Sequence, residues 1–426
     1  MLIAVLFASL FLMLLLGFPV AVALAGSSAL YVLLQGTVPD VIVLHRMVNG
    51  VDSFPLLAVP FFILAGNLMN TAGVTNRIFD FAIALVGWLR GGLGHVNVAA
   101  SVIFAGMSGT AVADAGGLGT IEIKAMRDRG YPLDFSLGIT AASSTIGPII
   151  PPSLPLVIFG VMANASIGQL FIAGFVPGLM MALALMIYVF WYAHSRGIAP
   201  DAAFRLSTLF RSFLRAFPAL MTPGLIIGGI LFGVFTPTEA AVAACVWALF
   251  LGLFLYRSLT WRRLLRVSAD TVETTAAVLF IVAAASIFAW VLTQARITEF
   301  LTLGLLAISD DPVVLLLLIN LVLLVVGCFM ETIAAITILV PVLLPVAARI
   351  GIDPVHFGIV MVLNLMIGLL TPPVGMVLYV LARVSGAPLS LAIRAVVPFL
   401  FPLLAVLLLI NFIPALTLWL PGLVYR

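Results

Sequence analysis

The chain has 426 residues, of which 64% are hydrophobic and only 8% are charged, and its formal net charge is +3. Soluble domains carry about 25% charged residues, so this composition excludes a water-soluble globular protein. Apolar stretches of spanning length recur along the chain and predict a polytopic, all-α membrane protein. Lys124 is the only lysine and lies outside any GxxxxGK[ST] sequence, so no Walker-type ATP site is expected. Cys245 and Cys328 lack the spacing of a metal or disulfide site.

The first elements expected are two spanning helices, Leu2–Leu16 and Pro19–Leu34. No basic residue precedes Arg46, so we interpret the first as a retained helix rather than a cleaved signal peptide. An amphipathic connector and a third span near Leu56–Asn70 follow, and then a second connector over Arg77–Leu89.

The next elements are interrupted by glycine and proline. A helical hairpin is expected over about 97–123 and a proline-broken helix over about 133–163, followed by a span ending near His194. The same order returns in the second half, with a hairpin over about 313–348 and a broken helix over about 354–382.

An internal repeat relates the two halves. When the chain is aligned with itself at a shift of 221 positions, Gly147 falls on Gly368, and the Pro151-Pro152 pair falls on Pro372-Pro373 without a gap. The sequence therefore predicts a first repeat over 1–196, a cytoplasmic linker over 197–216 and a second repeat over 217–426.

The distribution of charge predicts that the two repeats have inverted topologies. With both hairpins re-entrant, each half crosses the membrane an odd number of times. Basic residues then gather on the cytoplasmic side, and only Arg46, Arg296, Arg349 and Arg426 fall elsewhere. Asp310-Asp311 and Asp353 border the second hairpin, whereas basic residues border the first. Both termini are expected in the periplasm, and the Arg205–Arg215 stretch is interpreted as a solvated segment that anchors the spans to anionic lipid.

The helix breaks predict binding sites, because unwound backbone at membrane depth is tolerated only where protein or a water-filled cavity satisfies it. Each proline removes an N–H and disfavours helix at the preceding residue, which frees carbonyl groups. Together with hydroxyl groups these carbonyls suit a hard cation, and a helix that restarts after the break favours a carboxylate at its N-terminus. The first break contains Ser143, Ser144, Thr145, Gly147, Pro148, Pro151 and Pro152; the second contains Asn364, Gly368, Thr371, Pro372 and Pro373.

The hairpin tips are expected to complete the two sites. The first tip contributes Ser108, Gly109 and Thr110, and the second contributes Gly327, Glu331 and Thr332. Close helix packing is the competing interpretation of any single such cluster, but four clusters at symmetric positions favour binding. Asp114 is expected to be functional or paired. Glu239 is assigned to a capping box that begins at Thr236.

These residues resemble a known family. Val59-Pro-Phe-Phe-Ile-Leu-Ala-Gly-Asn-Leu68, Ala141-Ala-Ser-Ser-Thr-Ile-Gly-Pro-Ile-Ile-Pro-Pro-Ser153 and Gly368-Leu-Leu-Thr-Pro-Pro-Val-Gly375 resemble the large membrane subunit of tripartite ATP-independent periplasmic (TRAP) transporters. Gly94-His-Val-Asn-Val98 and Phe235-Thr-Pro-Thr-Glu-Ala-Ala241 carry the same likeness, which runs from about residue 1 to 420.

The resemblance implies an ion-transporter-superfamily fold that works as a sodium-driven elevator in the bacterial inner membrane. It also implies a small four-helix membrane subunit and a periplasmic substrate-binding protein as partners, with a small organic acid, such as a dicarboxylate or a sugar acid, as substrate. The coupling ion would be Na⁺, with no ATP. The family's cation sites map onto Ser108–Thr110 with Ser143–Pro148, and onto Gly327–Thr332 with Asn364–Pro372.

Two other functions compete with this one. The Gly106-Met-Ser108-Gly sequence has the form of a serine nucleophile, but the four histidines are expected at membrane edges or in connectors, away from a hairpin tip. A channel would conduct without a second substrate, whereas hairpins that enter from opposite faces favour alternating access.

Overall fold

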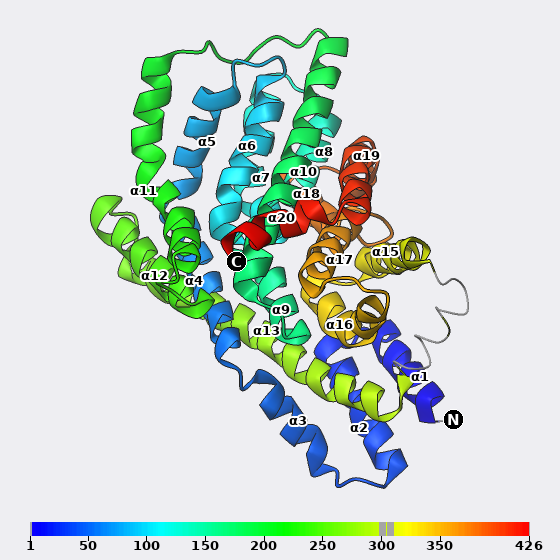
Figure 1. Ribbon diagram of the computed structural model, residues 1–426. Coiled ribbons are helices and arrows are strands. Elements are labelled where there is room, and N and C mark those ends of the chain that lie inside the picture. Colours follow the sequence, from blue (N-terminus) through cyan, green and yellow to red (C-terminus); the bar gives the residue numbers. More distant parts are fainter. Residues whose placement is uncertain (1, 298–303, 305–310, 426) are drawn as a thin grey trace.

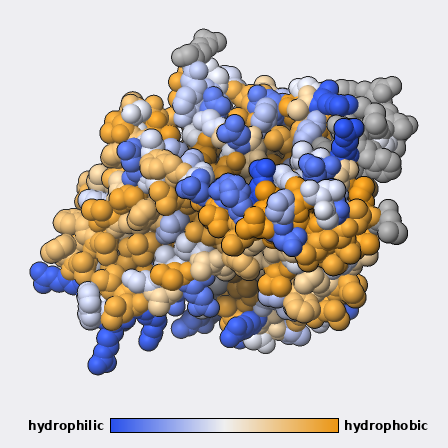
Figure 2. All heavy atoms as spheres, turned by 90° about the horizontal axis from the view of Figure 1, so that it is seen from below, coloured by the Kyte–Doolittle hydropathy of each residue, from blue (hydrophilic) through white to orange (hydrophobic). Residues whose placement is uncertain are grey.

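The computed structural model describes residues 2–297, 304 and 311–425, and the regular elements in these ranges are helices (Figure 1). Seven helical segments in this described part are long and apolar enough to cross a membrane. Figure 2 shows hydrophobic residues over much of the visible face, with hydrophilic residues gathered in groups between them. The prediction of an all-helical chain is confirmed, and its apolar helices support a multi-pass membrane protein.

The first half folds into a series of helices whose bounds lie close to those expected. In chain order they are α1 (Leu2–Leu15), α2 (Val20–Gln35), α3 (Val41–Val51), the 3-10 helix η1 (Phe54–Leu57), α4 (Ala58–Thr71), α5 (Val74–Val86), α6 (Gly92–Ser108), α7 (Ala111–Asp128), α8 (Leu133–Ser144), α9 (Leu154–Ala163) and α10 (Ile167–Ser195). With 14 and 16 residues, α1 and α2 are shorter than expected for spans, which need about 20 residues. Gly17, at a φ of 83°, and Pro19 form the turn that separates them.

The second half contains α11 (Leu206–Leu231), α12 (Pro237–Phe250), the π-helix η2 (Leu251–Leu255), α13 (Trp261–Gln294), α15 (Pro312–Phe329), α16 (Thr332–Arg349), α17 (Pro354–Gly368), α18 (Met376–Ser385), α19 (Leu389–Phe412) and α20 (Ala415–Val424). The predicted linker 197–216 is only partly a loop, because α11 already begins at Leu206. The capping box is confirmed: Glu239 N–H donates to Thr236 Oγ1 at 3.3 Å, and Thr236 N–H donates to Glu239 Oε2 at 2.8 Å. Asp310, used in the charge argument, lies outside the described residues.

In Figure 1, α5, α6, α10 and α11 stand side by side, and α13 runs obliquely past their lower ends toward α1 and α2. The larger apolar core extends through the hairpin helices and the broken helices. A smaller core joins α1 and α2 to the C-terminal part of α13, where Leu6, Leu24 and Phe288 are almost fully buried. The hairpins and the broken helices therefore share one packed interior.

Glycines permit two close approaches to the first broken helix. A Cβ atom on Gly174 of α10 would lie 2.1 Å from the carbonyl oxygen of Ile149, between α8 and α9. A Cβ atom on Gly138 of α8 would lie 2.3 Å from the carbonyl oxygen of Ala395 in α19. Because the opposing atoms are backbone, no side-chain rotation can relieve these contacts. Gly174 and Gly138 thus let α10 and α19 pack directly on the broken helix.

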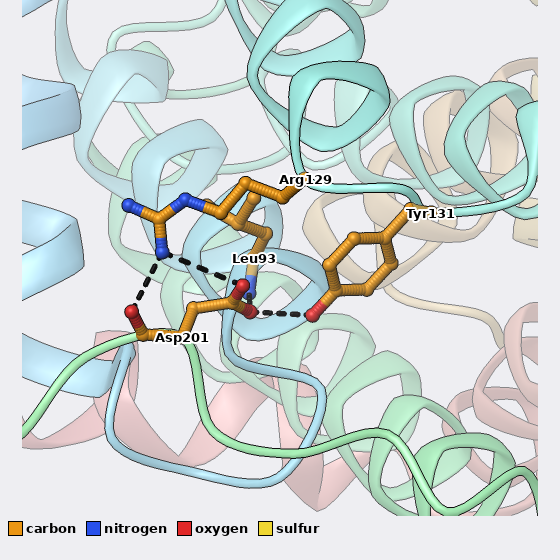
Figure 3. Close-up of polar contacts among 4 residues, drawn as sticks. All are labelled: Leu93, Arg129, Tyr131 and Asp201. Atoms are coloured by element: carbon orange, nitrogen blue, oxygen red, sulfur yellow. Dashed lines mark hydrogen bonds and ion pairs between the residues drawn. The ribbon is translucent and has the colours of Figure 1, made fainter.

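Asp201 holds the end of the first hairpin that is remote from its tip (Figure 3). Its Oδ2 atom accepts hydrogen bonds from Leu93 N–H at 2.8 Å and from the Tyr131 hydroxyl at 2.5 Å. Arg129 Nη1 donates to the Asp201 carbonyl oxygen at 2.6 Å and lies 3.5 Å from Oδ1. Burial and the Asp201 carboxylate raise the pKa of Tyr131 above its ordinary value. One aspartate therefore joins the segment after α10 to the start of α6 and to the α7–α8 loop.

Replacing Gly174 by Ala is expected to lower the free energy of unfolding by about 1–3 kcal/mol, because the added methyl group overlaps a backbone carbonyl. The apparent Tm of the purified protein in detergent measures this loss. Gly228→Ala is the matched control, since a Cβ atom at that position in α11 has no neighbour within 4 Å. Equal Tm values for Gly174→Ala and the wild type would contradict the packing described.

Replacing Asp201 by Ala is expected to lower the free energy of unfolding by about 1–3 kcal/mol, because the Leu93 N–H and the Tyr131 hydroxyl lose their acceptor. Tyr131→Phe removes only one of these hydrogen bonds and should cost less. Asp128→Ala, at an exposed position near the end of α7, is the control for the loss of one negative charge. Thermal unfolding should rank the losses as Asp201→Ala, then Tyr131→Phe, then Asp128→Ala, and any other order contradicts the anchoring role of Asp201.

Candidate functional site

Each hairpin tip begins a new helix with a side-chain cap. Between α6 and α7, Gly109 has a φ of 62°, and Thr110 Oγ1 accepts a hydrogen bond from Ala113 N–H at 3.3 Å. Between α15 and α16, Glu331 Oε2 accepts hydrogen bonds from Ile333 N–H at 2.8 Å and from Ala334 N–H at 3.2 Å. Thr110 and Glu331 thus act as N-caps, although Glu331 was expected to serve a binding site.

The proline-rich segments interrupt their helices as expected. The first break separates α8 from α9, and the second separates α17 from α18. The turn after each helix closes in the same way, with Ile149 N–H donating to Ile146 O and Leu370 N–H donating to Ile367 O, both at 3.0 Å. The Pro151–Pro152 and Pro372–Pro373 peptide bonds are both cis.

The first break is buried throughout and meets the first hairpin tip. A Cβ atom on Gly109 would lie 2.8 Å from the Pro152 carbonyl oxygen, so the tip rests directly on the break. Ser144 Oγ and Thr145 Oγ1 donate to carbonyl groups three residues earlier, at 2.8 and 2.6 Å. A hydroxyl that donates its hydrogen in this way keeps its lone pairs available for a cation. The side chain of Ser108 lies outside the part of the chain that the structure describes.

An asparagine links the broken helix to the first arm of each hairpin. Ser143 Oγ donates to Asn97 Oδ1 at 2.6 Å, and Asn364 Nδ2 donates to Asn320 Oδ1. Ser143 and Asn364 occupy equivalent positions in the sequence repeat. Asn364 Oδ1 is buried without a hydrogen-bond partner in the described structure, so it is free to bind a ligand. Asn97 and Asn320 were not predicted as site residues, although a polar residue within an apolar hairpin arm is a signal of function.

The second tip also rests on its break. A Cβ atom on Gly368 would lie 2.6 Å from the Cα atom of Gly327, so only two glycines fit there. Cys328 Sγ lies 2.9 Å from Thr371 Oγ1, and Thr371 Oγ1 donates to Gly368 O at 2.8 Å. In contrast to the buried first break, Pro372 is exposed. The two breaks therefore have similar backbone turns but different access.

A central cavity of about 490 Å³ lies where the two hairpins meet the broken helices. Thr110, Pro148, Glu331 and Thr332 are the predicted site residues among its lining. Thr332 Oγ1 is buried without a hydrogen-bond partner in the described structure. The other predicted residues, including Ser143–Thr145, Gly147, Asn364 and Thr371, are not among its lining residues.

Polar residues outside the repeat motifs line the same cavity. Asn67 and Asn70 come from α4, and Thr274 comes from α13. Asn67 is held by a 3.1 Å hydrogen bond from its Nδ2 to Thr271 Oγ1. Asn70 was expected only as the end of a span, and its position in the cavity lining was not predicted. Asparagines three residues apart lie on one helix face, and this was the available signal.

Two buried carboxyl groups lie on α7. Asp114 and Glu122 are each 1% exposed, and the described residues provide no ion pair for either. Asp114 Oδ2 and both carboxyl oxygens of Glu122 have no hydrogen-bond partner there. Asp114 thus has no basic partner among the described residues, its expected functional role stays a prediction, and neither carboxyl group lines the central cavity.

Comparison with known proteins gives the family. Residues 7–416 match the family described as "Tripartite ATP-independent periplasmic transporter, DctM component". The sialic acid TRAP transporter large permease protein SiaM of Vibrio cholerae is 50% identical over 409 residues, covering 96% of this chain and 95% of that protein. The C4-dicarboxylate TRAP transporter large permease protein DctM of Pseudomonas aeruginosa is 41% identical and covers 87% of each.

Two further similarities are informative. The sialic acid TRAP transporter permease protein SiaT of Haemophilus influenzae is 44% identical over 379 residues, which cover 89% of this chain but 62% of that protein. The crystal structure of the YdaH transporter of Alcanivorax borkumensis superimposes with a TM-score of 0.59 at 16% identity, covering 87% of each chain, and this likeness concerns the fold alone.

These relatives are transporter permease proteins rather than enzymes, which excludes the serine-protease hypothesis. Among the histidines, His194 lies 3.2 Å from Arg90 Nη1 and His356 lies 2.7 Å from Thr417 Oγ1, whereas His95 is buried in α6 with neither ring nitrogen hydrogen-bonded in the described structure. The match extends over nearly the whole chain, and the resemblance inferred from the sequence motifs is confirmed. The chain belongs to the DctM family, the large membrane subunits of tripartite ATP-independent periplasmic transporters.

Proposed function

We propose that the chain imports a small organic acid together with Na⁺, without ATP, and that the substrate binds in the central cavity. The observation that carries this proposal is the set of helix ends at the cavity. The first residues of α7, α9, α16 and α18 all belong to its lining, represented by Ala111, Leu154, Thr332 and Met376. A helix N-terminus carries a partial positive charge of about half a unit, so four of them favour an anionic ligand.

The charge of the cavity supports coupling to a cation. None of the lining residues in the described chain is basic, and the ionisable group among them is the acidic Glu331. A carboxylate that leaves water for such a site needs compensating positive charge. Partial charges from helix ends supply some of it, and a co-bound Na⁺ supplies the rest. Charge compensation therefore makes substrate binding depend on Na⁺.

Two polar clusters, one at each helix break, offer oxygen ligands suited to Na⁺. The first combines the buried hydroxyl groups of Ser144 and Thr145 with backbone carbonyl groups of the break, whose oxygens each have two lone pairs. The second combines Asn364 Oδ1, which lacks a partner in the described structure, with Thr371 Oγ1. Hard cations prefer such oxygen ligands.

The proposed mechanism is an elevator built from two inverted repeats. The hairpins and broken helices form the mobile transport part, and α4 and α13 belong to the scaffold that faces it across the cavity. The matching turns at Ile149 and Leu370 support the repeat. Each tip contacts its break through a glycine, Gly109 in the first and Gly327 in the second. In the proposed mechanism each tip separates from its break at this contact and exposes the ligand on one side of the membrane at a time.

The substrate and partners follow from the family. The SiaM relative, at 50% identity, makes sialic acid the first substrate to test, and a C4-dicarboxylate the second. Because the family is tripartite, the chain would work with a small four-helix membrane subunit and a periplasmic binding protein. The protein would lie in the bacterial inner membrane with both termini in the periplasm.

The test is uptake into proteoliposomes that contain the chain with its small subunit and binding protein. Sialic acid should accumulate when a Na⁺ gradient is imposed, with a fixed ratio of Na⁺ to substrate. If the accumulation of sialic acid does not depend on the Na⁺ gradient, the proposed coupling to Na⁺ is wrong. Flux without a fixed ratio of Na⁺ to substrate would identify a channel. Uptake of the C4-dicarboxylate but not of sialic acid would retain the mechanism and change the substrate.

Replacing Thr145 or Thr371 by Val keeps the side-chain shape and removes one oxygen. Loss of a ligand worth about 1–2 kcal/mol should raise the Na⁺ concentration for half-maximal uptake about 5- to 30-fold. Thr293→Val is the matched control, since Thr293 Oγ1 also donates to a backbone carbonyl, that of Ala289 at 2.9 Å, but lies outside both clusters. Unchanged Na⁺ dependence in both site variants would show that these hydroxyls do not bind the ion.

A further inference from the structure

A basic cavity lies between α5 and α11, apart from the transport site. It has a volume of about 250 Å³ and is lined by Arg77, Asp80, Ile83, Thr208, Arg211, Ser212 and Arg215. Three guanidinium groups against one carboxylate give it a formal charge of +2. Nothing in the transport mechanism uses these residues.

The three arginines are available to a ligand. The ion pair within the described part of the chain joins Arg129 to Asp201, so no carboxylate there lies within 4.0 Å of a guanidinium nitrogen of Arg77, Arg211 or Arg215. Like charges this close together repel one another unless an anion lies between them. The guanidinium groups of Arg77, Arg211 and Arg215 therefore line one cavity without a carboxylate partner in the described structure.

Arg77 is held in place for such a ligand. Its Nη1 donates to the Gly73 carbonyl oxygen at 2.9 Å, and its guanidinium carbon lies 3.8 Å from the centre of the Tyr256 ring. A guanidinium group has five N–H donors in a planar fork, so most remain free for the oxygens of a phosphate. Arg211 and Arg215 are one turn apart on α11 and face the cavity from the other side.

The surroundings of the cavity favour a lipid over a soluble anion. Leu206, Phe210, Leu214 and Phe217 recur at helical spacing along α11 and are 72%, 61%, 54% and 44% exposed. This apolar stripe lies within the candidate span Leu206–Leu231, which also carries Arg211 and Arg215. A helix with a basic face and an exposed apolar face lies where headgroups meet acyl chains.

We propose that the cavity between α5 and α11 binds the phosphodiester group of an anionic phospholipid, with the acyl chains along the α11 stripe. The phosphate lies between Arg77 of α5 and the Arg211–Arg215 pair of α11 and so joins the two helices. Phe81 and Phe213, whose ring centres are 5.7 Å apart, already pack α5 on α11 and set the width of the cavity. The Arg205–Arg215 stretch is thus a specific site rather than only a solvated anchor.

The proposal predicts selective stabilisation by anionic lipid. Phosphatidylglycerol added to the detergent-purified protein should raise its apparent Tm, whereas phosphatidylcholine and inorganic phosphate should not. In the variant Arg77→Gln/Arg211→Gln/Arg215→Gln, the increase should be lost. The triple variant Arg262→Gln/Arg266→Gln/Arg394→Gln removes the same charge from exposed positions elsewhere and should retain it. Equal responses of the two triple variants would overturn the site, and stabilisation by inorganic phosphate alone would overturn the lipid as its source.

A second measurement uses only the wild-type protein, so its outcome does not depend on whether a variant folds. A photoactivatable phosphatidylglycerol, added to the wild-type protein in complex with its small subunit, should crosslink to peptides from residues 74–86 and 206–217. Excess unlabelled phosphatidylglycerol should suppress these crosslinks, and phosphatidylcholine should not. Crosslinks distributed over all apolar helices, or their absence from α5 and α11 in the complex, would overturn the proposal; in the latter case a protein partner covers the cavity.

Discussion

The need to satisfy backbone polar groups at membrane depth is the constraint on which the rest of this structure depends. An interrupted helix leaves N–H and C=O groups without partners, and hydrocarbon offers none. In the first break, turns at Ile146 and Ile149 recover some of these bonds, and Ser153 Oγ donates to Pro148 O. The break is therefore buried in protein on all sides, and close packing by α10 at Gly174 follows from that.

The same constraint places helix N-termini at the cavity, although none of its described lining residues is basic. Each break or hairpin tip ends one helix and begins another, and the unpaired N–H groups of the new helix need acceptors. Thr110, Ser153 and Glu331 satisfy part of this need as N-caps of α7, α9 and α16. The first residues of these helices line the cavity, so the ligand proposed above would supply oxygen atoms as further acceptors.

The helices and breaks could be predicted from the sequence because their signals are local. Prolines at 151, 152, 372 and 373 and the apolar arms around Gly109 set the bounds of the hairpins and broken helices to within a few residues. The bounds expected for the first two helices, Leu2–Leu16 and Pro19–Leu34, agree with α1 and α2 to within one residue, because Gly17 and Pro19 mark the turn between them. The helical start of α11 was missed because its charges suggested a loop, whereas its apolar residues recur at helical spacing.

The site was only partly predictable, because its polar residues come from two kinds of element. Motif residues such as Thr110 and Thr332 could be found by aligning the two halves of the chain with each other. Asn67, Asn70 and Thr274 have no counterpart in that comparison, and they reach the cavity only through the packing of α4 and α13 on the hairpins. Contacts between elements distant in sequence are decided by tertiary packing, which periodicity and motif spacing do not encode.

This division of the lining has a consequence for selectivity. If an organic acid binds in this cavity as proposed, the residues from the repeats offer it backbone N–H groups and hydroxyls, which suit the negative charge shared by all organic acids. Asn67 and Asn70 offer side-chain amides, which both donate and accept hydrogen bonds and so can distinguish the hydroxyl or amide groups of one acid from another. Asn67 is held by Thr271, whereas Asn70 is exposed at the cavity and accepts from Thr75 Oγ1 at 3.2 Å, which leaves its amide nitrogen free. In the proposed binding mode, discrimination among carboxylates would therefore rest on α4, and recognition of the carboxylate itself on the helix breaks.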